Sequence, residues 1–466
     1  MAKDAKLEEL EKRSMWPLLV SYSLPAIVGM VAMSVYNLVD SIYVGQWCGA
    51  YAIAAMAIVF PVMNLMVAVG TLVGLGSAAT ASISLGQGKK IRAERVLGHC
   101  VMLGILLGIA VGWLPLPWLR EILQGFGATE NTVDGAYDFM LVLMLGFPLS
   151  SSFMNLNHLM RASGYPLRAM VSLLISMVVN VVTAPIFIYV MDWGLTGAAL
   201  ATVVAQLVGM VWVLAHYVDK RSVLHLRAGI YRMQWPLVRR ICTVGMPPCL
   251  LNICGCVVVV FFNFRFMQYD GDMGVAAYGV VNRVIFFFAM IVLGITQGLQ
   301  PIAGYNLGLG RYSRVKRVLC YAMVWASVIT VIGALSMEIF PRSIVSIFAS
   351  DSDANAATLI EIATRGVRLM GICFALVGSQ MVIGNFFQAI GRPIMSIFLN
   401  LTRQLFLLIP ALWLLPGWLG EPGIWLSQTT ADFLSSCLGF TVLYLFFKHA
   451  FPHKDVMLDD TAPSHE

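Results

Sequence analysis

The sequence predicts an all-α membrane protein in which twelve transmembrane helices form two pseudo-symmetric six-helix lobes. Three observations predict this fold class. The chain of 466 residues is 59% hydrophobic and only 12% charged, whereas about a quarter of the residues of a soluble domain are charged. Hydrophobic stretches long enough to cross a bilayer recur along the whole chain. The first six stretches also resemble the last six.

A helix needs about 20 apolar residues to cross the hydrocarbon core of a bilayer, and twelve stretches of the sequence meet this requirement. We expect an N-terminal segment at 1–16, a first lobe at 17–217, an inter-lobe loop at 218–236, a second lobe at 237–447 and a tail at 448–466. The expected spans are 17–44, 51–76, 95–117, 134–158, 168–190, 195–217, 237–267, 273–299, 316–340, 356–387, 394–415 and 423–447.

The Lys and Arg residues outside the spans alternate between the two sides of the predicted membrane. Nearly all of them fall in the N-terminal segment, the even-numbered connections and the tail, while the odd-numbered connections carry only Arg120 and Arg342. Cytoplasmic loops of membrane proteins carry an excess of Lys and Arg. We therefore expect a multi-pass protein of the cell membrane with both termini in the cytoplasm. The net charge of +6 then reflects topology, and no nucleic-acid partner is expected.

The two halves of the chain match each other at nearly constant spacing. Over the first three spans of each half the spacing equals that between Pro25 and Pro247, and later Pro166 matches Pro393 at a slightly longer spacing. Six spans per repeat is an even number, so both repeats enter the membrane from the same side and are parallel. Secondary transporters with parallel repeats bind substrate between the halves and rock them. Further matches pair Gly76 with Gly298, Gly86 with Gly308, Arg92 with Arg314, Ala162 with Ala389, and Gly164 with Gly391.

Several motifs resemble one known family over about residues 10 to 450. They are Leu24-Pro25, Asn37-Leu38-Val39-Asp40, Leu85-Gly86-Gln87-Gly88, Ala162-Ser163-Gly164-Tyr165-Pro166 and the run from Gln297 to Asn306. The chain resembles the multidrug and toxic compound extrusion (MATE) transporters, in their DinF-like prokaryotic branch. The resemblance implies two six-helix lobes and cation-driven efflux of amphipathic drugs. A sister branch of the wider superfamily flips lipid-linked intermediates.

Asp40 is the first candidate for coupling transport to a cation. It lies in the first span, three residues after Asn37, so the two share a helix face. An acid inside a membrane span is costly and usually marks a functional site. The matching residue of the second repeat is Phe262, so the fold does not require an acid there. A structural hydrogen bond or ion pair is the alternative role for Asp40.

Asn180 and Thr202 are expected to complete the coupling site with Asn37 and Asp40, because these oxygens could also bind a hard cation. Interhelical hydrogen bonding is an equally weighted role for Asn180 and Thr202. The family often carries a second acid before the proline of the fifth span, where this chain has Ala184. A single carboxylate favours H⁺ as the coupling ion, with Na⁺ as the alternative.

Two further groups of polar residues lie within the spans. Arg403 and Asp432 both fall near the middle of the bilayer, roughly 15 Å deep, so we expect a structural ion pair in the second lobe, with a second coupling site as the alternative. The arginines of the second lobe could form a basic cavity wall, which would favour anionic or zwitterionic substrates. Local ion pairing is the alternative role for these arginines. The candidates for the substrate pathway are Tyr36, Gln206, Arg283, Gln297, Gln300 and Arg365.

The leading functional prediction is a cation-coupled secondary antiporter that exports drugs or other amphipathic small molecules by alternating access. The alternative is a flippase or exporter of a lipid-linked or anionic lipid-like substrate, favoured by the second-lobe arginines. An enzyme is not expected, because no nucleophile and base, no metal-ligand set and no catalytic insert is recognisable. We expect no cofactor or metal, the lipid bilayer and small-molecule substrates as partners, and a functional monomer.

Overall fold

The computed structural model describes residues 2–48, 50–126, 128–130, 132–219, 221–227, 229–347, 356–451 and 455. Helices make up almost all of these residues, and they contain no β-strand. This confirms the predicted all-α class. The first half contains α1 (Ala2–Lys12), α2 (Met15–Cys48), α3 (Ala50–Gly86), α4 (Lys90–Gly112), η1 (Leu116–Trp118), α5 (Leu119–Gly125), α6 (Val133–Ala162), α7 (Pro166–Pro185), η2 (Ile186–Val190) and α8 (Gly194–Val218).

The second half repeats this succession of long helices. Its inter-lobe connection carries no helix among the described residues, and α9 follows it. The elements are α9 (Trp235–Tyr269), α10 (Gly271–Gly308), α11 (Tyr312–Ile339), α12 (Pro341–Ser346), α13 (Ala356–Gly371), α14 (Phe374–Ala389), α15 (Pro393–Leu401), η3 (Thr402–Leu408), α16 (Ile409–Leu419), α17 (Glu421–Leu445) and η4 (Phe446–Ala450).

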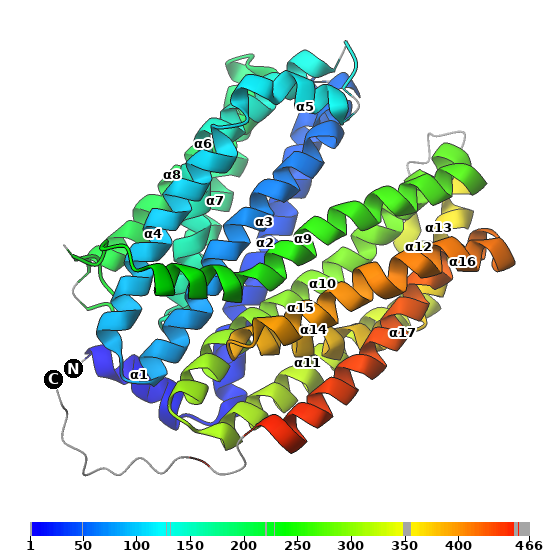
Figure 1. Ribbon diagram of the computed structural model, residues 1–466. Helices are drawn as coiled ribbons and strands as arrows, with labels where there is room; N and C mark the ends of the chain where they lie inside the picture. The colour runs from blue at the N-terminus through cyan, green and yellow to red at the C-terminus, as the bar shows by residue number, and fades with distance from the viewer. Residues whose placement is uncertain are drawn as a thin grey trace, which may run out of the picture.

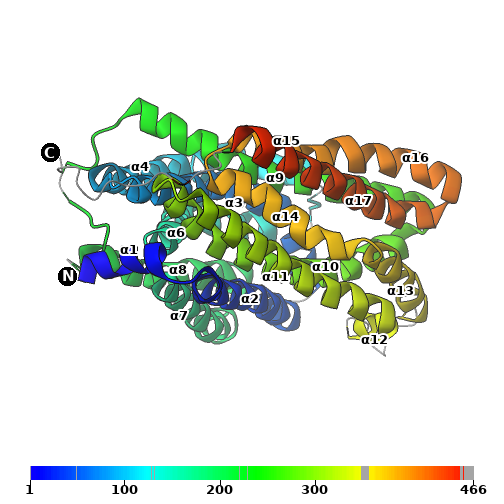
Figure 2. The same ribbon diagram turned by 90° about the horizontal axis from the view of Figure 1, so that it is seen from below.

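The long helices form two lobes, an N-lobe of α2 to α8 and a C-lobe of α9 to α17. Figure 1 shows that the lobes meet at the end where α1 lies, called here the α1 end, and diverge toward the opposite, far end. In the view from below, α7 and α8 lie at one edge of the molecule and α15 and α17 at the other (Figure 2). The lobes therefore form a V whose closed point is the α1 end.

The hydrophobic cores explain this shape. At the α1 end, one core takes buried side chains from both lobes, including Leu19 of α2 and Leu299 of α10. In the far half each lobe has a core of its own, around Val44 and Phe139 in the N-lobe and around Phe262 and Trp425 in the C-lobe. Because the shared core contains side chains of both lobes, it packs the lobes against each other at the α1 end.

Eleven helices among the described residues are long and apolar enough to cross a membrane, or twelve if one bent pair is counted as a single span. The bent pair is α13 and α14, which meet at an angle of 58°. The predicted tenth span, 356–387, is therefore broken rather than continuous. Gly371 is a poor helix former at the break, and the hydroxyl of Thr429 donates a hydrogen bond of 2.6 Å to the carbonyl of Leu369, which lies near the end of α13.

The backbones of the two lobes touch at the α1 end through matched glycines. A Cβ atom on Gly86 would overlap the carbonyl oxygen of Tyr305, and one on Gly308 would overlap that of Ile83. Gly86 and Gly308 are equivalent positions of the two repeats, as are Ile83 and Tyr305. The two contacts are therefore equivalent, with the roles of the N-lobe and the C-lobe exchanged. The repeat read from the sequence is thus a two-fold relation in space.

Candidate functional site

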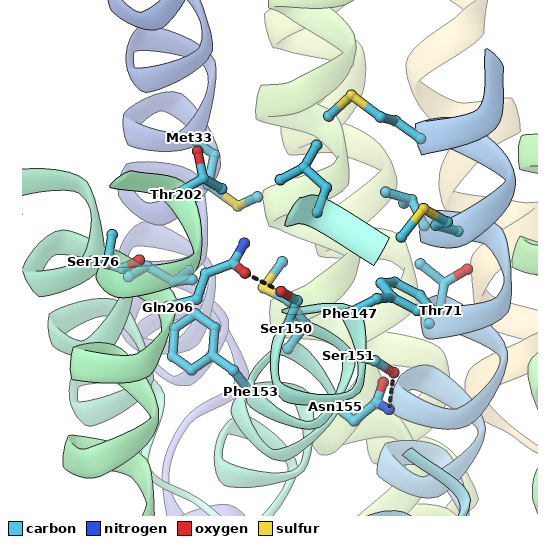
Figure 3. A pocket seen from close by; sticks show the side chains of 18 of the residues that line it. Met33, Thr71, Phe147, Ser150, Ser151, Phe153, Asn155, Ser176, Thr202 and Gln206 are labelled. Carbon is cyan, nitrogen blue, oxygen red and sulfur yellow. Dashed lines mark hydrogen bonds between the residues drawn. The ribbon is translucent and has the colours of Figure 1, made fainter. Parts of the chain in front are cut away.

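A cavity of about 280 Å³ lies inside the N-lobe, between α2, α3, α6, α7 and α8. Its wall is mainly apolar, with several methionines and two phenylalanines, and Figure 3 shows its polar side chains. Methionine adapts to irregular ligands because its side chain is flexible and polarisable. The wall includes Met33, Met63, Met66, Thr71, Phe147, Ser150, Ser151, Phe153, Met154, Asn155, His158, Met177, Asn180, Thr202 and Gln206.

The polar groups of the wall are paired with one another across neighbouring helices. The amide of Asn180 on α7 donates to the hydroxyl of Thr202 on α8 over 3.3 Å. Gln206, one turn further along α8, accepts a hydrogen bond from the hydroxyl of Ser150 on α6 (Figure 3). The structure thus brings together Asn180, Thr202 and Gln206, which the sequence analysis placed in the coupling site and the substrate pathway.

Asp40 lies on the same face of α2 as the cavity wall. It is seven residues after Met33, which lines the cavity, and four before Val44, which packs in the N-lobe core with Ala184 and Ile188. Residues at these spacings share a helix face, so Asp40 faces α7 and α8 beyond the far end of the cavity. Its side chain is 7% exposed, and its Oδ1 atom has no hydrogen-bond partner in the described part of the chain.

The remaining members of the predicted coupling site are less well defined. The side chains of Tyr36 and Asn37 lie outside the residues that the structure describes. Ala184, which takes the place of the family's second acid, is fully buried in the N-lobe core. That position therefore contributes packing and supplies no oxygen. No group of three or more His, Cys, Asp or Glu side chains that could hold a metal ion occurs among the described residues.

Gln297 and Gln300 lie between the lobes and do not line the N-lobe cavity. Gln300 donates to the carbonyl of Leu75 on α3 over 3.1 Å. Gln297 accepts a hydrogen bond from Arg161 on α6 and lies 3.7 Å from the sulfur of Met30 on α2. The two glutamines therefore connect α10 to three helices of the N-lobe. Sequence position alone assigned them to the substrate pathway, but the helix face that carries them is the one packed against the other lobe.

Two arginines were predicted to make a basic cavity wall in the C-lobe. Arg365 instead forms an ion pair of 2.8 Å with Glu421 and lies 3.8 Å from Glu361. This is the local pairing that the sequence left open as the other role. Arg283 is exposed on α10, beside Gly279, where a Cβ would meet open space. Its guanidinium has no ion pair within the part of the chain that is described.

Arg403 and Asp432 form an ion pair inside the C-lobe, as their depth in the spans suggested. The Nε atom of Arg403 lies 2.8 Å from Oδ1 of Asp432, which also accepts a hydrogen bond of 2.9 Å from Gln428. Arg403 belongs to η3, a π-helical segment. Such segments occur frequently at functional sites. The side chain of Asp432 is 4% exposed and that of Arg403 is 18% exposed.

Sequence reasoning assigned no functional role to Arg161 or His158. Arg161 lies in the last turn of α6, where a basic residue was read only as a topology signal. In the structure it is buried and contacts both Gln297 and His158. The signal that could have found it is the repeat, because Ala162 matches Ala389 and the residue before Ala389 is Gln388 rather than an arginine.

Comparison with known proteins decides the family. The MatE family model matches residues 25–186 and again residues 247–414, and the two matches begin at the prolines that the internal repeat pairs, Pro25 and Pro247. The chain belongs to the MatE family. Members of this family are transporters, not enzymes. The chain is therefore a multi-pass membrane transporter.

The relatives extend over nearly the whole chain. The multidrug export protein MepA of Staphylococcus aureus is 24% identical over 445 residues, which cover 95% of this chain and 96% of that protein. MepA of Staphylococcus saprophyticus is similar to the same extent. Among solved structures, a MOP superfamily transporter from Pyrococcus furiosus superimposes with a TM-score of 0.90 at 22% identity, over 94% of this chain and 97% of that one.

A MATE transporter solved in a straight and in a bent conformation gives a TM-score of 0.88 with each structure, at 22% identity. The straight conformation matches 94% of this chain and 98% of that one, and the bent conformation matches 95% and 97%. At this identity the likeness establishes the fold alone. Together with the family model, it confirms the two-lobe architecture.

Proposed function

We propose that this protein exports amphipathic small molecules, including drugs, across the cell membrane in exchange for protons. The observation that carries the proposal is the position of Asp40, a buried carboxylate with an unpaired oxygen on the helix face that carries Met33 of the cavity wall. The relatives described above are named multidrug export proteins, which supports this substrate class. An adaptable, methionine-rich wall suits ligands of varied shape.

A proton fits the site better than a sodium ion. Sodium and similar hard cations need several oxygen ligands, and the position of the family's second acid is filled by Ala184. A lone carboxylate can change its charge by taking up one proton. Its attraction for a cationic substrate would change at the same moment. Asp40 would then be the coupling residue, with Asn37 as its neighbour on α2.

The V shape supports transport by alternating access. Because Lys and Arg gather in the connections at the α1 end, we place this end in the cytoplasm. The described arrangement would then be open to the outside. Protonation of Asp40 from outside would weaken substrate binding, and closure of the far end would carry the proton inward. Coupling requires that proton and substrate bind the two arrangements with different affinities.

A single chain as the functional unit is supported by the cavity, whose lining comes entirely from one lobe of one chain. The exporter of a lipid-linked substrate receives less support than it did from sequence alone. Arg365 was one of its basic residues, and it is paired with Glu421. Arg283 is the remaining candidate from that pair for contact with an anionic lipid.

The test is dye export by the purified protein in liposomes with an imposed pH gradient. We expect the wild type to move the cationic dye rhodamine 123 when a gradient is present, and the Asp40→Asn variant to lose at least about tenfold in gradient-driven rate. Asp138→Asn serves as the matched control, since it also removes one carboxylate of the N-lobe but at an exposed position of α6. Equal export by wild type and Asp40→Asn would refute coupling through Asp40, and export that requires Na⁺ at constant pH would refute the choice of ion.

A further inference from the structure

Arg161 is a buried cation that the function described so far does not use. Its side chain ends α6 inside the protein, where the residue is 5% exposed. One of its nitrogens donates to Oε1 of Gln297 on the C-lobe helix α10, and the other lies 2.9 Å from Nδ1 of His158. Both acceptors are neutral groups. In the described part of the chain, no carboxylate forms an ion pair with Arg161.

His158 connects this guanidinium to the cavity. The imidazole lies in the cavity wall, one turn before Arg161 on α6. Because the guanidinium can only donate, Nδ1 of His158 must accept, and the ring proton therefore stays on Nε2. From Phe147 to His158 the cavity follows α6 for about 16 Å. Its inner end thus presents the Nε2–H donor of His158, whereas the carboxylate of Asp40 lies beyond its outer end.

The fold does not require an arginine at this position. The C-lobe residue that matches Arg161 is Gln388, which is buried to a similar degree. Its Nε2 atom has no partner among the described residues, so the C-lobe tolerates an unsatisfied amide in the corresponding place. At this pair of matched positions the N-lobe carries a charge and the C-lobe does not. The same is true of the matched pair Asp40 and Phe262.

The partner of Arg161 depends on how the lobes are arranged. Gln297 belongs to the C-lobe and reaches into the N-lobe, where it also contacts Met30. When the lobes separate at the α1 end, Gln297 must move away from Arg161. Leaving a buried cation without a hydrogen-bond acceptor costs free energy. The guanidinium then needs another oxygen, and the opening lobes expose it to the side from which a substrate enters.

We propose that Arg161 binds the carboxylate of an amphipathic substrate while the α1 end is open, and that Gln297 takes the place of this carboxylate when the α1 end closes. The inference rests on the proposed export function and names a substrate class for it: molecules with a carboxylate at one end and an apolar or cationic body. Replacement by Gln297 gives a reason for release, because closure supplies Arg161 with an internal acceptor. His158 is a positioning residue, because its Nδ1 atom accepts a hydrogen bond from Arg161 and holds the guanidinium next to the cavity wall.

A purely structural role for Arg161 makes a different prediction. A cation in the last turn of a helix is stabilised by the helix dipole, and the contact with Gln297 could merely hold the lobes together. Removing such an arginine would weaken all substrates alike or unfold the protein. A role in recognition would instead change the preference between two substrates that differ only in a carboxylate.

The test uses two dyes with the same body, rhodamine 110, which has a free carboxyl group, and rhodamine 123, its methyl ester. Equilibrium binding to the full-length protein in lipid nanodiscs is followed by fluorescence anisotropy without a pH gradient. We expect Arg161→Gln to weaken binding of the acid at least about tenfold, the usual strength of one charge-assisted hydrogen bond, and to change ester binding less than about twofold. Arg161→Lys should keep part of the preference, and the matched variant Gln388→Leu should keep all of it.

A second variant tests the exchange of acceptors. Gln297→Leu leaves Arg161 without its internal acceptor, so we expect the acid to bind more tightly and the ester to bind as in wild type. Equal losses for both dyes in Arg161→Gln, or no loss for either, would overturn the proposal, as would unchanged acid binding in Gln297→Leu. Binding needs no proton coupling, so failure of the Asp40 experiment would leave this measurement readable.

Discussion

The ion pair between Arg403 and Asp432 offers a quantitative test of how the C-lobe is stabilised. Arg403→Met leaves the carboxylate with the single amide of Gln428, 2.9 Å away. Breaking a buried pair by removing one partner costs about 3–5 kcal/mol. Because Arg403 is 18% exposed, we expect the low end, about 3 kcal/mol of the free energy of unfolding. Asp432→Leu leaves the guanidinium unpaired and should cost a similar amount.

The double variant Arg403→Met/Asp432→Leu decides the reasoning. It removes both charges and replaces them with apolar groups, a change that is often neutral. We expect a loss of about 1 kcal/mol or less, so the summed losses of the two single variants should exceed the loss of the double variant by about 5 kcal/mol. Reversible unfolding of the protein in lipid bicelles measures the four free energies. If the double variant loses the sum of the two single losses, the ion pair is not the interaction that makes each change costly.

Two further predictions concern the lobe contact and the first helix. Gly308→Ala should push the lobes apart at the α1 end, because the new Cβ would overlap the carbonyl of Ile83. The distance between spin labels on α3 and α10 should therefore lengthen, and an unchanged distance distribution would contradict the prediction. The control is Gly279→Ala, whose new Cβ would lie in open space on α10. Burial alone would raise the pKa of Glu9, but hydrogen bonds and charges from Lys6 and Arg13 outweigh it and hold this pKa below its usual value of 4.5. A lowered carboxyl pKa stabilises the fold above pH 4.5, and this effect is lost as pH falls through the folded-state pKa. The protection factors of the α1 amides, which correct each exchange rate for the intrinsic rate at that pH, should therefore fall below about pH 4, and they should not do so in Glu9→Gln.

Most of the architecture could be predicted because bilayer thickness and loop charge constrain a membrane protein strongly. Span length, the alternation of basic loops and the constant spacing of the internal repeat together lead to two parallel six-helix lobes. The break between α13 and α14 could not be predicted, because it depends on Thr429 of another helix reaching the carbonyl of Leu369. Hydropathy averages over such a tertiary contact.

The candidate site was predictable to the extent that it rests on residues that are costly in a membrane. Asp40 stands out for that reason, and Arg403 and Asp432 could be paired from their depth alone. Gln297, in contrast, was assigned to the substrate pathway because the sequence does not say which face of α10 meets the other lobe. Arg161 was missed because a basic residue at a span end is ordinary. Its burial and its contacts with Gln297 and His158 distinguish it from the basic residues that are exposed in the loops.

The shared core at the α1 end makes each lobe a long lever with a common fulcrum. Ser23 of α2 contacts Gly298 of α10 near this fulcrum, and Val44 lies 21 residues further along α2, about 32 Å away. A tilt of about 10° at the fulcrum would therefore displace the far end of the helix by roughly 5 Å. If the lobes rock about this contact, side-chain changes of atomic size beside Gly298 would produce displacements of several ångströms at the far end.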